Sequence, residues 1–208
     1  LVTRSAEDRE PADPSRLESY KKIRQLAGRY VEEQIERTRR GVDPPPPELA
    51  AHLEAHAEEL EALRRRLTDG PPPRWELQIE RLFSAPIPNL IGNINLQKLL
   101  LADALAHGAG GDHEGALECL EASWKLNAAL REDPVLITQL IAIAVTRMQV
   151  GTLRQLREVP EVWRERLAED SFRDSFLVAL QLESRIWIQA DDLSMMNLAP
   201  NLLQKVSA

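Results

Sequence analysis

Residues 96–150, LQKLLLADALAHGAGGDHEGALECLEASWKLNAALREDPVLITQLIAIAVTRMQV, decide the fold that we predict for this chain. Apolar residues recur at three- and four-residue steps on both sides of the glycine-rich stretch 108–112, which predicts two amphipathic helices joined by a turn. A third helix, 135–150, follows Pro134 and is apolar on nearly every side. Because such a helix must be covered on most faces, we expect 135–150 to be the buried centre of the molecule.

This third helix carries one thin polar stripe, formed by Gln139, Ala142, Thr146 and Gln149. These positions lie three or four residues apart and therefore share one face of the helix. Buried polar side chains need hydrogen-bond partners. We expect the stripe to face a neighbouring backbone or buried water, and a ligand-lined groove is the alternative.

The composition indicates an all-α globular fold. Hydrophobic residues make up 43% of the 208 residues and charged residues 28%, which argues against a wholly disordered chain. Leu, Ala, Glu, Arg and Gln dominate, and all favour helices. The net charge of −7, without a block of five Lys or Arg, argues against a nucleic-acid partner. We interpret the cluster Arg64–Arg66 as a solvated helix face.

The cysteine count and the hydropathy pattern exclude some kinds of site but leave the cellular compartment open. Cys119 is the only cysteine, which excludes an internal disulfide and a multi-cysteine metal site. The longest apolar segment, 135–150, includes Gln139 and Arg147, so we predict no membrane span within this chain. The chain begins at Leu1, which leaves open a removed signal or anchor. We expect a soluble protein, either cytoplasmic or extracytoplasmic.

Proline-rich segments divide the chain into three predicted parts. Residues 1–14 are charged and aperiodic, and we expect a disordered lead-in there. Residues 15–69, interrupted by the prolines at 44–47, are predicted to form a coiled-coil-like helical hairpin, because their apolar stripes are narrow. A triple proline, 71–73, marks the next boundary. Residues 74–208 are predicted to form a helical bundle of repeat-like antiparallel hairpins.

Residues 96–134 resemble a tetratricopeptide repeat. The second half of that repeat typically has a Gly-Asp turn, small residues at two helix positions, a large apolar residue between them and a Leu-Asn end. The chain matches this pattern at Gly111-Asp112, Ala116, Leu120, Ser123 and Leu126-Asn127. The turn is about two residues longer than usual for the repeat, and no second repeat follows. The resemblance implies a helical hairpin and a protein-binding role.

Two acidic residues and a histidine are candidates for chemistry. Asp103 and His107 lie four apart on one helix, and an acid held against an imidazole can serve as a general base. The ordinary alternative is a helix-stabilising pair. Glu183 lies on an aromatic helix face, where burial would raise its pKa. We prefer to pair Glu183 with Arg147 as a buried structural ion pair, since buried charges need partners.

His52 and His56 are the histidines with metal-ligand spacing, four residues apart on a predicted helix. A zinc-protease motif would place Glu directly after the first histidine, but this chain has Leu53 there. Their only further candidate ligand is Glu59, and a zinc site needs three or four. We therefore predict a solvated helix surface at these histidines, with no metal and no cofactor.

These observations favour a non-enzymatic protein-protein interaction or scaffold module. The alternative is a helical enzyme or small-ligand-binding protein with a pocket near Asp103, His107 and Glu183. Self-association through the 15–69 hairpin is a further possibility. The sequence names neither the partner nor the process.

Overall fold

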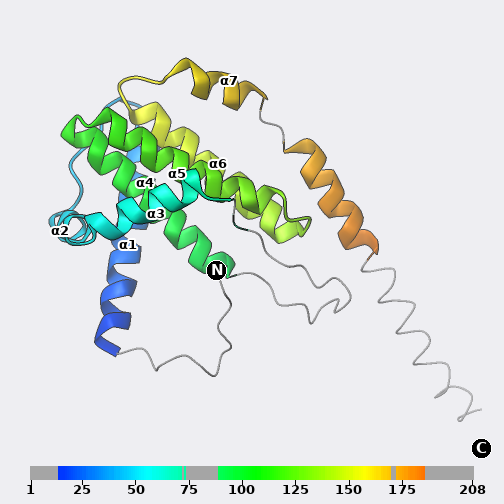
Figure 1. The fold of residues 1–208 in the computed structure, drawn as a ribbon, viewed down its shortest axis with the longest axis horizontal. Helices are drawn as coiled ribbons and strands as arrows, with labels where there is room; N and C mark the ends of the chain where they lie inside the picture. Colours follow the sequence, from blue (N-terminus) through cyan, green and yellow to red (C-terminus); the bar gives the residue numbers. More distant parts are fainter. Residues whose placement is uncertain (1–13, 72, 74–88, 170–171, 186–208) are drawn as a thin grey trace, which may run out of the picture.

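The computed structural model describes residues 14–71, 73, 89–169 and 172–185. These residues form helices and contain no strand, so the all-α prediction is confirmed (Figure 1). Residues 173–185 are helical as well. The labelled helices are α1 (Pro14–Glu36), α2 (Pro47–Ala55), α3 (Ala57–Asp69), α4 (Leu90–Gly110), α5 (His113–Arg131), α6 (Leu136–Gln155) and α7 (Glu161–Glu169).

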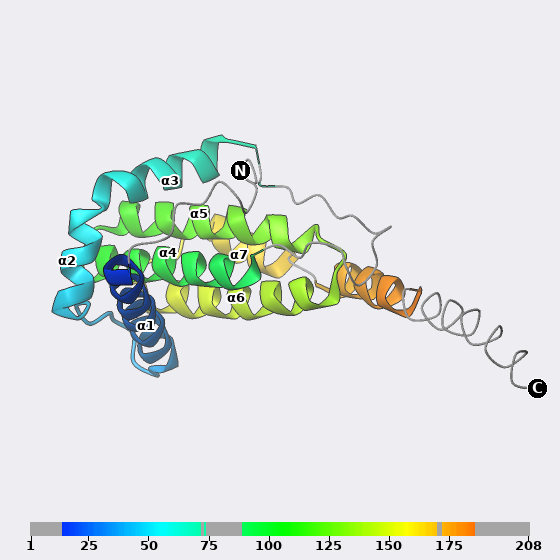
Figure 2. The same cartoon turned by 90° about the horizontal axis from the view of Figure 1, so that it is seen from below.

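The antiparallel pair α4–α5 forms the centre of the bundle, with α3 on one side and α6 on the other (Figure 2). Helix α4 continues through Gly110, so the predicted five-residue turn is only Gly111-Asp112. Gly111 has φ +82°, a conformation that favours glycine, and it ends α4. Asp112 begins α5 by accepting a hydrogen bond from the backbone N–H of Gly115 at 3.0 Å.

Helix α6 lies at the edge of the bundle, so the prediction that it is the buried centre is wrong. Its outward face contains four large apolar side chains that are 38–47% exposed, namely Ile137, Leu140, Ile143 and Val150. Its buried face is unusually polar for a core helix. The buried polar side chains of α6 are Thr138, Gln139, Gln149, Thr152 and Gln155.

Hydrogen bonds to α5 explain why the polar stripe of α6 faces inward. Gln149 donates to the hydroxyl of Ser123 at 2.8 Å, and Asn127 donates to the hydroxyl of Thr146 at 2.8 Å. Gln139 donates to backbone carbonyls at the end of α5, including that of Arg131 at 3.0 Å. The expected contact with a neighbouring backbone is confirmed for Gln139, whereas Thr146 and Gln149 meet side chains of α5.

The N-terminal helices do not form the predicted coiled-coil-like hairpin. Helix α1 packs mainly on α4 and α6, whereas α3 packs on α5. His56 interrupts the predicted second helix and separates α2 from α3. The leucines of the predicted seam, including Leu49, Leu53 and Leu60, belong to the core that α4 and α5 share. These leucines are buried within one chain, and self-association through residues 15–69 stays a prediction. Residues 1–13 of the predicted lead-in and all of residues 74–88 lie outside the described residues, and Pro14 is the first residue of α1.

Helices α1 and α6 approach closely at Gly151. The predicted helix 135–150 ends just before this glycine, but α6 continues through it to Gln155. A Cβ atom at Gly151 would lie 2.7 Å from the Cβ of Ile35. Four residues further, Gln155 donates to the carbonyl of Arg37 at 3.1 Å, and Arg154 donates to the same carbonyl at 3.2 Å. The glycine is therefore required by tertiary packing.

Replacing Gly151 with alanine should destabilise the protein, because the new methyl group meets the branched carbon of Ile35. We expect a loss of about 1–3 kcal/mol in the free energy of unfolding, measured by urea denaturation. Gly110→Ala is the matched control, since nothing lies within 4 Å of a Cβ there. The control should change stability by less than about 1 kcal/mol. Equal effects of the two substitutions would contradict close packing at Gly151.

Replacing Gln149 with leucine should cost about 1–3 kcal/mol, because it leaves buried polar groups on α5 without partners. Val150→Ala, on the exposed side of the same helical turn, should stay within about 0.5 kcal/mol of the wild type. The measurement is again the free energy of unfolding. A neutral Gln149→Leu would show that the polar contacts do not orient α6.

Candidate functional site

A buried carboxylate, Asp103 of α4, lies where α3, α4 and α5 meet. Its Oδ2 atom is 2.6 Å from Nη1 of Arg64 on α3, and the two side chains are only 8% and 12% exposed. The thiol of Cys119, from α5, donates to the same oxygen with an Sγ–Oδ2 distance of 3.3 Å. The carboxylate thus has a charged partner and a neutral donor, as buried charges require.

His107 extends this cluster toward the α4–α5 turn. Its Nε2 lies 3.7 Å from Oδ1 of Asp103, and its Nδ1 lies 2.7 Å from Oδ2 of Asp112. With Nδ1 bonded to Asp112, the other ring nitrogen, Nε2, faces Oδ1 of Asp103. The backbone N–H of Gly115, followed by His107, lowers the pKa of Asp112 below its usual value. Asp112 is therefore an anionic acceptor for the imidazole.

Cys119 is not an accessible nucleophile in this arrangement. The side chain is completely buried, and burial followed by the charge of Asp103 raises the pKa of the thiol far above its usual value. A buried protonated thiol is inert toward substrates in solution. Its role in the structure as it stands is to donate a hydrogen bond to Asp103.

The structure brings together two of the three residues of the predicted pocket, Asp103 and His107. Asp103 and His107 are neighbours, but Glu183 belongs to the helical segment 173–185. That segment lies beyond the α5–α6 connection, at the end of the bundle opposite the α4–α5 turn (Figures 1 and 2). Because Arg64 already pairs with Asp103, the carboxylate is not free to act as a general base. The predicted three-residue pocket is therefore wrong.

The predicted buried ion pair of Arg147 with Glu183 is also wrong, because Arg147 is exposed. The buried pair is Arg64 with Asp103, and the sequence contained a signal for it. Arg64 lies four residues after Leu60 and three before Leu67, both of which are buried. That spacing places the arginine on the inward face of α3. Our interpretation of Arg64–Arg66 as a solvated face missed this position.

His52 and His56 do not belong to a converging group of three donor residues in the described part of the chain. Their ring centroids are 4.2 Å apart, and Nδ1 of His56 lies 2.9 Å from the carbonyl oxygen of His52. Partial burial, followed by the charge of His56, lowers the pKa of His52. Among the described residues, the donor atoms that do converge are those of Asp103, His107 and Cys119, all within 4.8 Å of one another.

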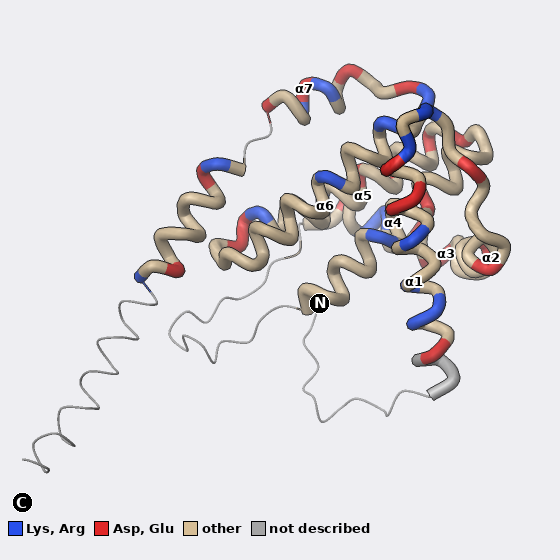
Figure 3. The backbone as a smooth tube through the Cα atoms, turned by 180° about the vertical axis from the view of Figure 1, so that it is seen from behind, with Lys and Arg blue, Asp and Glu red and all other residues tan. Residues whose placement is uncertain are grey.

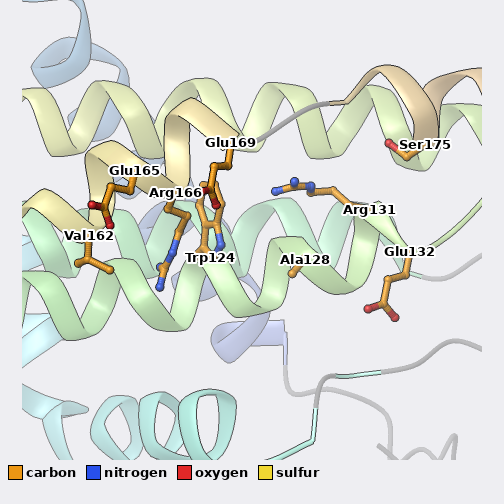
Figure 4. Close-up of a pocket in the computed structure, with 9 residues that line it drawn as sticks. All are labelled: Trp124, Ala128, Arg131, Glu132, Val162, Glu165, Arg166, Glu169 and Ser175. Atoms are coloured by element: carbon orange, nitrogen blue, oxygen red, sulfur yellow. The ribbon is translucent and has the colours of Figure 1, made fainter.

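A hollow of about 640 Å³ separates α5 from α7 beside Trp124 (Figure 4). Trp124 meets Trp163 of α7 edge to face, with ring centroids 5.6 Å apart. The guanidinium of Arg166 lies 4.6 Å from the Trp163 ring and forms an ion pair with Glu121 at 2.5 Å. Both arginines near Trp124 stack on aromatic rings, since Arg131 lies over Phe172. We interpret these contacts as the attachment of α7 to α5.

A second hollow, of about 960 Å³, is a groove between α1, α4 and α6. We call it the α6 groove. Its apolar lining includes Leu140, Ile141, Ile143, Ala144 and Val150. Its charged lining consists of Glu32, Glu36, Lys98, Arg147 and Arg154.

By length and composition alone, α6 is also the one helix in the described residues that could cross a membrane. In this structure 39% of its apolar window is buried against the rest of the chain. Length and hydropathy do not distinguish a spanning helix from the core helix of a bundle. The absence of a membrane span therefore stays a prediction.

Comparisons with known proteins give no family for this chain. No family model, curated protein or solved structure matches it. Function is therefore inferred from two features of the structure, the cluster around Asp103 and the α6 groove.

Replacing Arg64 with alanine should destabilise the protein by about 3–5 kcal/mol, because Asp103 would be left buried without its charged partner. Arg65→Ala is the control. The side chain of Arg65 is 70% exposed and pairs with Glu61 one turn away, so we expect a change below about 0.5 kcal/mol. Urea denaturation measures both. A neutral Arg64→Ala would contradict the ion pair.

Proposed function

We propose that this protein is a non-enzymatic interaction module that binds an amphipathic helix of a partner protein in the α6 groove. One observation carries the proposal. The polar face of α6 is bonded to α5, and large apolar side chains are left facing water. Exposed apolar surface of this kind, bordered by charges, is typical of a protein-binding site.

The free energy available to a partner is substantial. Fully burying one Leu, Ile or Val side chain contributes about 1.5–3 kcal/mol. Leu140 and Ile143 in the groove are 47% and 38% exposed, and Val150 is 41% exposed. Burying the exposed parts of these three side chains under a partner would contribute several kcal/mol to the free energy of binding, from which the entropic cost of association is subtracted.

The length of the groove favours an α-helix as the bound part of the partner over a flat protein surface. Residues 140–154 of α6 line it, a length of about 20 Å at 1.5 Å per residue. Three to four helical turns of a partner would fit along it, with apolar residues at positions i, i+3, i+4 and i+7.

The charges of the groove favour a partner helix that carries both acidic and basic residues beside its apolar face. Helix α6 carries only Arg147 and Arg154 as charged residues, whereas α1 is charged along its length (Figure 3). Glu36 and Arg147 are both exposed in the groove lining. A partner with a basic residue facing Glu36 and an acidic residue facing Arg147 would complement them.

Within this proposal, α4–α5 would act as a tetratricopeptide-like hairpin that supports the groove. Small residues permit close helix packing in such hairpins, and Ala116 and Ser123 are both completely buried in α5. The enzyme alternative has less support. Its acid is paired with Arg64, and the helical segment 173–185, which contains Glu183, lies at the end of the bundle opposite the α4–α5 turn (Figure 1).

The test is selection of helical peptides of about 20 residues from a displayed library on the immobilised protein. Selected peptides should show the i, i+3, i+4, i+7 apolar pattern. Their affinity, measured by fluorescence anisotropy, should fall at least about 10-fold with Leu140→Glu and Ile143→Glu combined. Val162→Glu, at a 54% exposed site on α7, makes the same chemical change outside the groove. The control should bind as the wild type does.

Three results would contradict the proposal. The first is the absence of selected peptides, or peptides whose binding the groove variant does not weaken. The second is a wild-type dimer in sedimentation that the groove variant converts to a monomer, since the occupant would then be a second copy. The third is flotation with phosphatidylglycerol vesicles that the groove variant abolishes, since the occupant would then be a membrane.

A further inference from the structure

We propose that Asp103, His107 and Cys119 bind a zinc ion at the α4–α5 turn, a site separate from the α6 groove. The three residues supply one oxygen, one nitrogen and one sulfur atom, a donor set that suits zinc. Two of them lie one turn apart on α4, and the third lies on the facing side of α5. Their possible ligand atoms all lie within 4.8 Å of one another.

The distances are close to those that a tetrahedral zinc ion imposes. Metal–ligand bonds of about 2.0–2.3 Å place neighbouring ligand atoms roughly 3.3–3.8 Å apart. The distance from Asp103 Oδ1 to His107 Nε2 is 3.7 Å. Cys119 Sγ lies 3.3 Å from the other carboxylate oxygen, Oδ2. One ligand atom from each of the three residues lies within 4.8 Å of the others, so the thiol must turn from Oδ2 toward Oδ1 to share one ion with His107.

A second observation is that His107 is already oriented as a metal ligand. Zinc-binding histidines usually donate the other ring N–H to a carboxylate, which fixes the ring and increases its basicity. Asp112 accepts in this way from Nδ1 at 2.7 Å, leaving Nε2 directed at Asp103. Gly115 makes room for this contact, because a Cβ there would lie 2.5 Å from Asp112 Oδ2 and 2.7 Å from His107 Nδ1.

Zinc binding replaces the proton of the thiol: the ion adds two positive charges and Cys119 releases one proton to water, so the cluster gains one positive charge. The charge of Asp103 is already offset by Arg64, and the anionic carboxylate of Asp112 beside His107 offsets the added charge. Arg64 keeps its contact with Oδ2, so Oδ1 is the atom that faces the ion. The His107 side chain is 29% exposed, so the ion can enter from the solvent side, where water supplies a fourth ligand.

Bound zinc would join α4 to α5 next to their connecting turn. Ion binding to the folded chain alone would raise its melting temperature with zinc concentration. This role does not depend on the α6 groove, and the peptide-binding experiment does not test it.

The experiment is titration of the whole chain with Co²⁺, followed by competition with Zn²⁺. We expect one equivalent of Co²⁺ to give visible bands of tetrahedral coordination and a near-ultraviolet thiolate charge-transfer band. Zn²⁺ should remove both and raise the melting temperature. Cys119→Ser should abolish the charge-transfer band, and His107→Gln should abolish stoichiometric binding. Asp112→Asn should weaken binding about 10–100-fold, because it removes the anionic partner of His107.

The matched control is the double variant His52→Gln, His56→Gln, which removes the other histidine pair and should bind Co²⁺ like the wild type. Circular dichroism of each variant without metal verifies that it is folded. The wild-type spectrum is decisive even if a variant fails to fold, since absence of the thiolate band would overturn the proposal. Binding that survives Cys119→Ser and His107→Gln unchanged, or that the histidine control abolishes, would overturn it equally.

Discussion

The hydroxyl of Ser123 on α5 lies between a glutamine of α4 and a glutamine of α6, and the arrangement of α6 depends on these contacts. It donates to Gln97 at 2.6 Å and accepts from Gln149 at 2.8 Å. All three side chains are completely or almost completely buried, so turning any of them away would leave polar groups without partners. The polar face of α6 must therefore point inward, and its apolar face forms one wall of a groove.

The cluster at the α4–α5 turn follows a different constraint, which is the burial of a single charge. Asp103 requires Arg64, and this requirement brings α3 onto the side of α5 opposite α6. The same carboxylate gathers Cys119 and His107 around it. The Asp103 cluster and the α6 groove thus have separate physical origins on shared helices. A substitution in the cluster should leave the groove unchanged, and the reverse, because the two are formed by different side chains.

Much of the local structure could be predicted, whereas the placement of α6 could not. The sequence signals at Asp112, Gly111 and Pro134 located the turn and helix starts to within a few residues, because capping is local. The polar stripe was recognised, and so was its need for backbone partners. We predicted that the most apolar helix, 135–150, is the buried centre. That prediction is wrong because the hydropathy of a helix does not show which other helices pack against it. The cluster was half predicted, since Asp103 and His107 are neighbours by helical spacing alone.

By itself, the sequence determined the helical class, the α4–α5 turn and the single polar stripe of α6, because these follow from helix propensity, capping and spacing within a few residues. Only the tertiary structure decided that Arg64 reaches Asp103, which lies 39 residues later, and that Cys119 joins them. It also decided that α1 and α6 meet at Gly151 and leave a groove beside them. Periodicity specifies the face of a helix on which a residue lies, but packing of distant helices selects what that face meets.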